Sequence, residues 1–275
     1  MAKNEFVDVR SKYVVKPGTK IDLAAVDTAE TGEFQTPKQG KKALKKYRKT
    51  LSKLQERFYA WNKKAVLVVL QGMDTAGKDG TIRHVMSGVN PQGVVVTSFK
   101  VPTPEELAHD YLWRIHKATP RRGMIGIFNR SHYEDVLVVR VHDLVPPAVW
   151  SQRYEQINAF EKFLTENDVV ILKFFLHISK EEQARRLQAR LDNPEKRWKF
   201  NIGDLKERAL WDDYMAAYTD AVQKCSTEHA PWYVVPSDNK WYRNYVVGQI
   251  ITATLHDLNP QFPEPEAGLD DVVIV

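Results

Sequence analysis

A glycine-rich segment with a lysine and two aspartates is the part of the chain best suited to chemistry. The segment Gly72–Thr81 reads GMDTAGKDGT and directly follows the apolar run Ala65–Leu70. A buried strand that ends in such a turn and continues into a helix can hold a phosphate group, because main-chain N–H groups and the helix dipole face the anion. Lys78 would reach the outer phosphates. We predict that the phosphate-binding residues of this loop are Gly72, Thr75, Ala76, Gly77, Lys78, Asp79, Gly80 and Thr81.

Two carboxylates make this loop unusual. Asp79 stands where related loops carry a Ser or Thr whose hydroxyl holds magnesium, and Asp74 lies inside the loop. A carboxylate near phosphate oxygens is repelled unless a cation lies between them. Because Mg²⁺ binds carboxylate and phosphate oxygens together, we expect Asp74 to be a metal ligand, with Mn²⁺ as a second possible ion. A turn hydrogen bond is the alternative role for Asp74, and placement at a helix N-terminus is the simpler role for Asp79.

A second segment with candidate catalytic residues is Phe128–Asp135, which reads FNRSHYED. Phosphoryl transfer spreads negative charge over the oxygens of the moving group, and Arg130 can contact two of these oxygens at once. Glu134 and Asp135 could bind magnesium indirectly or hold a sugar or base, and helix capping is the alternative for one of the two. We expect His132 to be structural. The predicted catalytic residues are Asp74, Lys78 and Arg130.

A basic segment follows the fourth predicted strand. Residues 180–199 contain seven Lys or Arg and four acids. Arg186 and Arg190 lie on one helix face because they are four residues apart, and Asn193-Pro194 then breaks the helix. This pattern is typical of a mobile lid that closes over a phosphate site and excludes water. The lid residues predicted to bind phosphate are Arg186, Arg190, Lys196, Arg197 and Lys199.

Another concentration of positive charge lies between Lys38 and Lys64, with eleven Lys or Arg and a single acid, Glu56. Such clusters favour binding of a polyanion, which could be nucleic acid, an acidic membrane or an extended phosphate compound. A solvent-exposed helix face is the alternative for this cluster. The sequence has no RNA-binding aromatic motif and no zinc-ligand spacing, so we expect no nucleic-acid partner.

Short apolar runs rich in Val and Ile alternate with helical patterns along the chain. The predicted strands, which we expect to be buried on both faces, are Ala65–Gln71, Val94–Phe99, Met124–Asn129, Val169–Ile178 and Trp232–Pro236. The predicted helices include 78–89, 104–117, 149–166, a long region over 180–226, and about 241–255. This alternation predicts an α/β fold, a three-layer α/β/α sandwich with a parallel five-stranded sheet. Ligands in such sheets bind beyond the carboxyl ends of the strands.

Before the first of these strands, residues 1–37 are expected to form an extended arm, and a long helix follows it. One apolar stripe recurs at spacings of three and four along that helix, formed by Leu44, Tyr47, Leu51, Leu54, Phe58 and Trp61. The helix is therefore expected to pack on another part of the protein with this stripe and to show a basic face.

Taken together, the glycine-rich loop, the Phe128–Asp135 segment and the basic segment resemble the family-2 polyphosphate kinases, and two further segments add to the resemblance. The segments that carry the resemblance lie within residues 40–257 and are Gly72–Thr81, Phe128–Asp135, Asn193–Lys199, Trp211–Tyr214 and Ala230–Val235. The resemblance implies a P-loop kinase fold similar to thymidylate kinase, with a helical lid. It also implies a reversible, magnesium-dependent transfer of the terminal phosphate of inorganic polyphosphate to a nucleotide, by a homodimer or homotetramer. We accordingly expect an arm at 1–40, a kinase domain at 41–257 with the lid inserted at about 180–215, and a tail at 258–275.

The resemblance also distributes the substrates over the site. The loop and the lid bases would hold polyphosphate, and the nucleotide phosphates would lie near Asp74 and Arg130. Asn129 departs from many family members, which have a catalytic Asp there, so Asp74 would carry more of the metal binding. The combination of Asn129, Glu134 and Asp135 resembles the subgroup that accepts both AMP and ADP, with ATP as a product. The expected nucleotide-binding residues are Asn129, Arg130, Tyr133, Glu134 and Asp135.

An ATP-dependent nucleoside monophosphate kinase is the alternative enzyme, and the missing Ser or Thr after Lys78 counts against it. The composition suits a soluble protein, with 43% hydrophobic residues and a net charge of +5 over 275 residues. The single cysteine, Cys225, cannot form an intramolecular disulfide, the N-terminus lacks a signal-peptide pattern, and no apolar run approaches the length of a membrane span. We therefore expect a cytoplasmic enzyme without a membrane partner.

Overall fold

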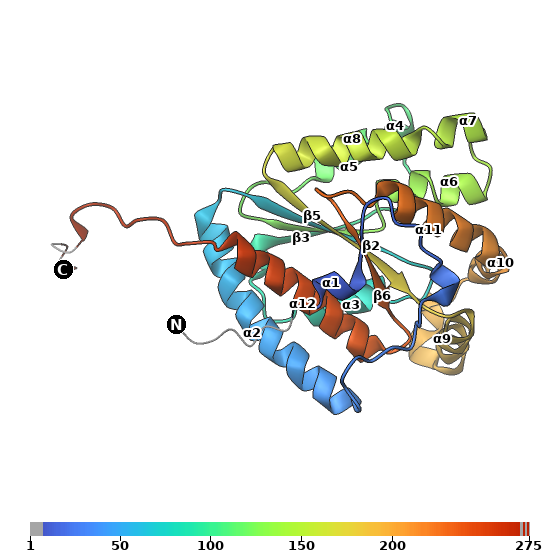
Figure 1. Cartoon of the computed structure of the whole chain (residues 1–275), viewed down its shortest axis with the longest axis horizontal. Coiled ribbons are helices and arrows are strands. Elements are labelled where there is room, and N and C mark those ends of the chain that lie inside the picture. The colour runs from blue at the N-terminus through green and yellow to red at the C-terminus, as the bar shows by residue number, and fades with distance from the viewer. Residues whose placement is uncertain (1–7, 270–271, 273, 275) are drawn as a thin grey trace.

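The computed structural model describes residues 8–269, 272 and 274. Its centre is a six-stranded sheet with the strand order β1-β6-β5-β2-β4-β3 (Figure 1). The strands are β1 (Val14–Val15), β2 (Ala65–Gln71), β3 (Val94–Ser98), β4 (Ile125–Asn129), β5 (Val169–His177) and β6 (Trp232–Pro236). Strands β2 to β6 are parallel, so their carboxyl ends meet at one edge of the sheet. The predicted α/β sandwich is confirmed.

The number of strands corrects the prediction of a five-stranded, wholly parallel sheet. β1 pairs antiparallel with β6, with Val14 opposite Tyr233 and Val15 opposite Trp232. This strand belongs to the residues that we expected to be an extended arm. The arm also contains the short helix α1 (Arg10–Tyr13), and Leu23 is 2% exposed. A two-residue strand is too short to produce a recognisable periodicity, which is why the sequence pattern did not indicate it.

The predicted bounds of β2 and β6 are confirmed, and those of the other parallel strands differ by a residue at one end. The expectation of burial on both faces is wrong for β3, where Val95 and Val96 are 46% and 47% exposed. β3 lies at the edge of the sheet and pairs only with β4, so it has fewer neighbours to cover it.

Helices form a layer on each face of the sheet (Figure 1). One layer contains α2 (Pro37–Trp61), α3 (Lys78–Val85) and α12 (Lys240–Leu258), which pack against one another. The other layer contains α8 (Arg153–Glu166) and α11 (Trp211–Cys225). Thr36 caps α2 with a reciprocal capping box to Gln39, and the apolar stripe of this helix is turned inward, with Leu51 1% and Phe58 0% exposed. None of the helices in the described part of the chain is long and apolar enough to cross a membrane.

The segment 104–117 is not the single helix that was predicted. It forms α4 (Pro104–Leu107) and α5 (Trp113–Ala118), with a turn between them. The side chain of Asp110 accepts a hydrogen bond from the main-chain N–H of Leu112 at 3.0 Å. Such a local side-chain bond offers the backbone an alternative to the helix and explains the break. The remaining short helices on this side are α6 (Val138–Val141) and α7 (Pro147–Trp150).

The long region 180–226 contains several elements rather than one helix. α9 (Lys180–Asp192) is followed by a 3₁₀ helix at Pro194–Lys199, by α10 (Gly203–Ala209) and by α11. Asn193 ends α9, and its side chain caps the 3₁₀ helix by accepting from the N–H of Glu195. α9 and α10 lie beyond the carboxyl end of β5, whereas α11 lies over a face of the sheet (Figure 1). Because β2 and β5 are parallel, the phosphate loop emerges at the same edge of the sheet.

Candidate active site

The phosphate loop joins β2 to α3, and its backbone depends on glycine. Gly72 and Gly77 have φ angles of 155° and 100°, the second in the left-handed region, and Gly77 is the N-cap of α3. A Cβ on Gly72 would lie 2.7 Å from the carbonyl oxygen of Leu176, and a Cβ on Gly77 would overlap the Arg243 guanidinium. The loop therefore needs both glycines to pack against β5 and α12 while it presents the N-terminus of α3.

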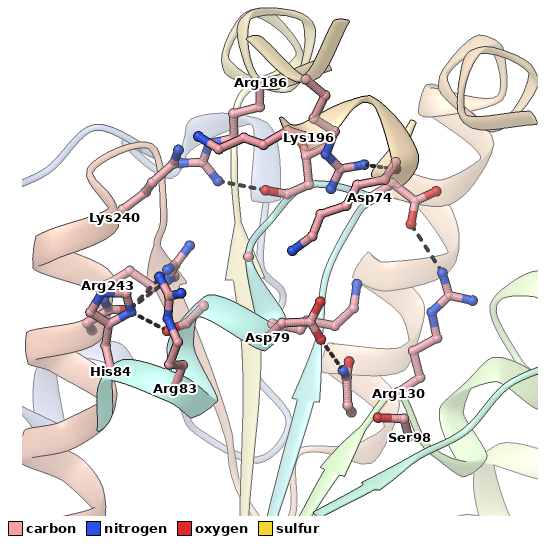
Figure 2. A pocket seen from close by; sticks show the side chains of 18 of the residues that line it. Asp74, Asp79, Arg83, His84, Ser98, Arg130, Arg186, Lys196, Lys240 and Arg243 are labelled. Atoms are coloured by element: carbon pink, nitrogen blue, oxygen red, sulfur yellow. Dashed lines mark hydrogen bonds and ion pairs between the residues drawn. The ribbon is translucent and has the colours of Figure 1, made fainter. Parts of the chain in front are cut away.

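A cavity of about 930 Å³ opens over this loop (Figure 2). Eleven Lys or Arg side chains line it, against the two aspartates Asp74 and Asp79. Beyond the predicted site residues, the cations come from α2, α3, the β3–α4 loop and α12, and they are Lys41, Arg83, Lys100, Lys240 and Arg243. Such an excess of positive charge suits the cavity to a polyanion.

Lys78 bends back over the loop that precedes it. Its Nζ donates to the carbonyl oxygen of Gly72 at 2.6 Å and lies 3.5 Å from that of Met73. Burial lowers the pKa of Lys78, and the nearby charge of Arg130 lowers it further. The ammonium group is thus partly desolvated and close to the main chain of the loop, where it can interact strongly with an anion.

Asp74 and Arg130 form an ion pair across the mouth of the loop. Arg130 Nη2 lies 3.1 Å from Asp74 Oδ1, and the two side chains remain 41% and 26% exposed. Arg130 has a φ angle of 62°, which is costly for a residue with a Cβ and is often found where a side chain must be aimed at a ligand. The loop after β2 and the segment after β4 therefore meet through this pair.

Asn129 and Asp79 make a second link between the same segments. Asn129 Nδ2 donates to Asp79 Oδ1 at 2.6 Å. In the described part of the chain, no group of three or more His, Cys, Asp or Glu is placed to hold a metal ion. A cation here would therefore need ligands from phosphate and water beside those that the protein offers.

A smaller cavity of about 410 Å³ lies on the other side of the Asp74–Arg130 pair. The two cavities share Asp74, Arg130 and Val101. The polar residues that line only the smaller cavity are Glu134, Asn201, Asp204, Glu207, Tyr214 and Tyr218. Burial raises the pKa of Asp204, and the charge of Asp74 raises it further. The smaller cavity is therefore acidic and aromatic where the larger cavity is basic.

Arg186 is a residue of α9 and holds the phosphate loop in place through hydrogen bonds. Its Nη1 donates to the carbonyl oxygens of Thr75 and Ala76 at 2.9 and 3.2 Å, and its Nε donates to Glu182 at 2.6 Å. Its Nη2 donates to the carbonyl oxygens of Ser237 and Asp238 at 2.5 and 2.9 Å. Although Arg186 borders the larger cavity, its hydrogen bonds go to the loop and not to open space.

The other predicted lid residues divide into two groups. Arg190, Lys196 and Lys199 line the larger cavity. Arg197 does not line it, because its Nε donates to the carbonyl oxygen of Leu191 at 2.7 Å within the lid itself. Helical spacing indicated the basic face of α9, but no sequence pattern shows which side of the irregular 3₁₀ segment faces the loop.

Two of the predicted nucleotide-binding residues lie outside both cavities. Tyr133 is 0% exposed, and its hydroxyl donates to Glu161 at 3.0 Å. Asp135 pairs with Arg153 at 3.0 Å, and burial raises the pKa of Asp135 to about 6 although Arg153 opposes the shift. His132 is also buried and lies 3.2 Å from Glu161, as its expected structural role requires. Of this segment, Asn129, Arg130 and Glu134 reach the cavities.

Residues that the sequence reasoning missed include Lys240 and Arg243 of α12, and Asp204, Glu207 and Tyr218. The sequence pattern predicted only a helix at about 241–255, and it gave no role to the cations of α12, which are isolated in an apolar segment. The acids of α10 carry no recognisable motif, and only the fold brings them beside Asp74. Tyr214 lies in the Trp211–Tyr214 segment, which is the signal that could have pointed to this wall of the smaller cavity.

Proteins of known sequence resemble this chain over most of its length. The family model for polyphosphate kinase 2 matches residues 35–263. The chain is 55% identical over 264 residues to the AMP/ADP-polyphosphate phosphotransferase of Meiothermus ruber, covering 96% of this chain and 99% of that protein. It is 45% identical over 265 residues to the ADP-polyphosphate phosphotransferase of Rhodopseudomonas palustris, covering 92% of each.

A solved structure supports the same assignment. The crystal structure of polyphosphate kinase 2 from Arthrobacter aurescens TC1 superposes with a TM-score of 0.93 at 45% identity, over 98% of this chain and 97% of that one. The match covers the sheet, both helical layers and the segments that form the two cavities. The chain therefore belongs to the polyphosphate kinase 2 family.

Proposed function

We propose that this protein transfers the terminal phosphate of inorganic polyphosphate to AMP and to ADP, giving ADP and ATP. The observation that carries the proposal is the pair of unlike cavities that meet at Asp74 and Arg130. One cavity is strongly basic and suits a phosphate chain, and the other is smaller and suits a nucleotide. The names of the Meiothermus ruber and Rhodopseudomonas palustris relatives support the choice of both substrates.

The larger cavity is assigned to polyphosphate because its cations extend well beyond the loop. Lys41 of α2 and Arg83 of α3 lie on one side, and Lys196 and Lys199 of the lid lie on the other. Three phosphates of ATP would not need cations spread over so many elements, whereas a linear chain would contact them in succession. The basic face of α2 that the sequence showed is thus partly explained by Lys41 at the cavity edge.

The smaller cavity is assigned to the acceptor nucleotide. Glu134 and Asp204 can accept hydrogen bonds from ribose hydroxyls or from an exocyclic amine, and Tyr214 and Tyr218 offer aromatic surface to a base. Because this cavity shares Asp74 and Arg130 with the larger one, the phosphate of a nucleotide would end beside the terminal phosphate of the chain. The same arrangement would serve AMP and ADP if the lid adjusts to the extra phosphate.

The residues then act by positioning and by neutralising charge. Lys78 and the N-terminus of α3 would hold the donor phosphate, and Arg130 would contact oxygens of the group in transfer. Mg²⁺ fits the donor set, since this ion commonly takes one or two carboxylates and completes its shell with phosphate and water oxygens. Asp74 would hold it, and the bound ion would offset the negative charge that develops on the phosphate oxygens. Mn²⁺ would suit the same oxygen ligands.

The lid supports the reaction by excluding water. We propose that residues 180–215 form this lid on a catalytic domain at 41–257, with an arm at 1–40 and a tail at 258–275. The cations Arg190, Lys196 and Lys199 would close over the phosphate chain when it binds. Closing the site would prevent hydrolysis of the donor.

The test is a reaction with AMP, Mg²⁺ and polyphosphate in the absence of ATP. We expect ADP and then ATP, separated by ion-exchange chromatography, and no product with the Lys78→Ala variant. A second reaction, with ATP in place of polyphosphate, distinguishes the proposed activity from that of the alternative enzyme, a nucleoside monophosphate kinase. If ATP supports ADP formation from AMP and polyphosphate does not, the proposal is refuted.

A further inference from the structure

Arg243 on α12 is a buried cation that lies directly against the phosphate loop. Its side chain is 2% exposed and borders the larger cavity. Its Nη1 donates to the carbonyl oxygen of Ala76 at 2.6 Å. Its Nε and Nη2 donate to the amide oxygen of Asn244 at 3.2 and 2.9 Å. All of these acceptors are neutral.

The positive charge of Arg243 is consequently not balanced by the protein. Within residues 8–269, no carboxylate forms an ion pair with it, whereas Arg186 beside it has Glu182. Burial lowers the pKa of Arg243 to about 9, and the charge of Arg186 lowers it further. A buried charge without a counterion is unfavourable. The folded chain therefore carries an electrostatic cost at this position that an anion in the cavity would relieve.

The geometry of the loop shows what this arginine holds in place. The Ala76 carbonyl accepts from Arg243 and also from Arg186 Nη1 at 3.2 Å, so two guanidinium groups fix one peptide. In a trans peptide the carbonyl and the next N–H point in opposite directions. The N–H of Gly77 is therefore directed away from the two guanidinium groups, to the other side of the loop. Gly77 also allows the close approach, because a Cβ there would overlap Arg243 Nη1.

We propose that Arg243 is a positioning residue whose charge is balanced by the bound phosphate chain. It fixes the Ala76–Gly77 peptide of the loop, and it adds positive potential beneath the loop that the unliganded protein cannot neutralise. The inference rests on the proposed function, because inorganic polyphosphate is the anion that it invokes. It follows that Arg243 strengthens binding of the donor while it does not stabilise, and even destabilises, the unliganded fold.

Arg243→Gln tests this, since glutamine keeps an N–H donor for Ala76 and removes the charge. The probe is tripolyphosphate, with affinity measured by calorimetry and the unliganded stability by urea unfolding. We expect its dissociation constant to rise by roughly ten- to a hundredfold, with the urea midpoint of the unliganded protein unchanged or higher. In steady-state assays the KM for polyphosphate should rise while the KM for AMP stays within about twofold.

Arg140→Gln is the matched control. Arg140 is a partly buried arginine that pairs with Asp220 at 2.6 Å, outside both cavities. We expect this variant to be less stable and to bind tripolyphosphate normally. If Arg243→Gln behaves like Arg140→Gln, with lower stability and unchanged affinity, Arg243 is merely structural and the inference is overturned.

Arg243→Lys decides the question if the glutamine variant does not fold. Lysine keeps the charge but cannot hold Ala76 and Asn244 together, so the charge alone should preserve tripolyphosphate affinity within about threefold. A loss of tenfold or more in a folded lysine variant would show that the hydrogen bonds to Ala76 and Asn244 set the affinity for the donor, and it would overturn the inference that the bound chain balances the charge of Arg243. The wild-type reaction separates the two proposals. Without product from AMP and polyphosphate the proposed function fails, whereas a normal wild type with an unaffected Arg243→Gln variant refutes only this inference.

Discussion

The buried pair of Lys173 and Glu161 gives a stability prediction that can be worked out from the structure. Lys173 is the central residue of β5, and both side chains are 0% exposed. Lys173 Nζ donates to Glu161 Oε2 at 2.5 Å, to the Tyr133 hydroxyl at 2.8 Å and to the carbonyl oxygen of Cys225 at 2.6 Å. Tyr133 and His132 join Glu161 to the segment that carries Arg130, so this network supports the active site from within the core.

Lys173→Met removes the cation and leaves Glu161 as a buried carboxylate. Removing one partner of a buried ion pair costs about 3–5 kcal/mol, a large share of the roughly 5–15 kcal/mol by which a domain is stable. We expect a loss of this size in the free energy of unfolding, measured with urea at pH 7.5, and a similar loss for Glu161→Gln. The double variant should lose less than the sum of the two single losses, because no unpaired charge remains.

The pH dependence sharpens this prediction. Burial opposes ionisation of Glu161, but Lys173 and His132 outweigh it and lower the pKa of Glu161 below its usual 4.5. The stability that this carboxylate contributes is therefore present above that value and is lost as the pH falls through the lower, folded-state pKa. Without Lys173, Glu161 would take up a proton at higher pH, so the difference between wild type and Lys173→Met should shrink on acidification. Losses that add within about 0.5 kcal/mol in the double variant would refute the reasoning.

Three further predictions concern the site. Lys78→Ala and Asp74→Ala should each lower kcat by about 10²–10⁴ with an unchanged circular dichroism spectrum, because both act on charge at the transferred group, and near-normal turnover would remove the residue from the site. Lys199→Ala should raise the KM for polyphosphate by about three- to tenfold, because Lys199 lines the larger cavity. Arg197 lies outside the cavity, so Arg197→Ala should change this KM by about twofold or less. Equal effects of the two variants would contradict the assignment of the lid face. Asp135 has a folded-state pKa of about 6, above the ordinary 3.8. Between these two pH values the unfolded chain loses the proton of Asp135 more readily than the folded protein, so the free energy of unfolding should fall as the pH rises, by up to about 3 kcal/mol. Asp135→Asn should flatten that decline in urea midpoints between pH 4 and about pH 6, and an unchanged slope would show that Asp135 does not cause it.

Much of the fold could be predicted because the parallel strands other than β3 are buried and their short runs are mostly apolar. β2 and β6 have the predicted bounds, and the loop after β2 joins the expected strand and helix. What could not be predicted depends on neighbours distant in sequence. β3 begins with three valines, as a buried strand could, and its place at the sheet edge leaves Val95 and Val96 exposed. β1 exists because β6 offers it a partner.

The candidate site, like the fold, could be predicted from the sequence only in part. Asp74, Lys78 and Arg130 face the cavities, since a motif and a strand end fix where these side chains emerge. A sequence does not show whether a charged side chain binds a ligand or forms hydrogen bonds with other groups of the protein. Arg186 has the type and helical position of a phosphate ligand, yet its hydrogen bonds go to main-chain carbonyls, as do those of Arg243 to Ala76.

The pairing of β1 with β6 shows that residues outside the family match, which line neither cavity, still contribute to the fold. The family match begins at residue 35, and each residue that lines the two cavities lies beyond that point. A shortened protein that starts there would nevertheless lose Tyr13, Val15 and Leu23 from the core. It would also leave the backbone of β6 unpaired along one side, as a template for another chain. Expression of this enzyme, or its fusion to other proteins, should therefore preserve the residues before α2, although none of those that the structure describes lines either cavity.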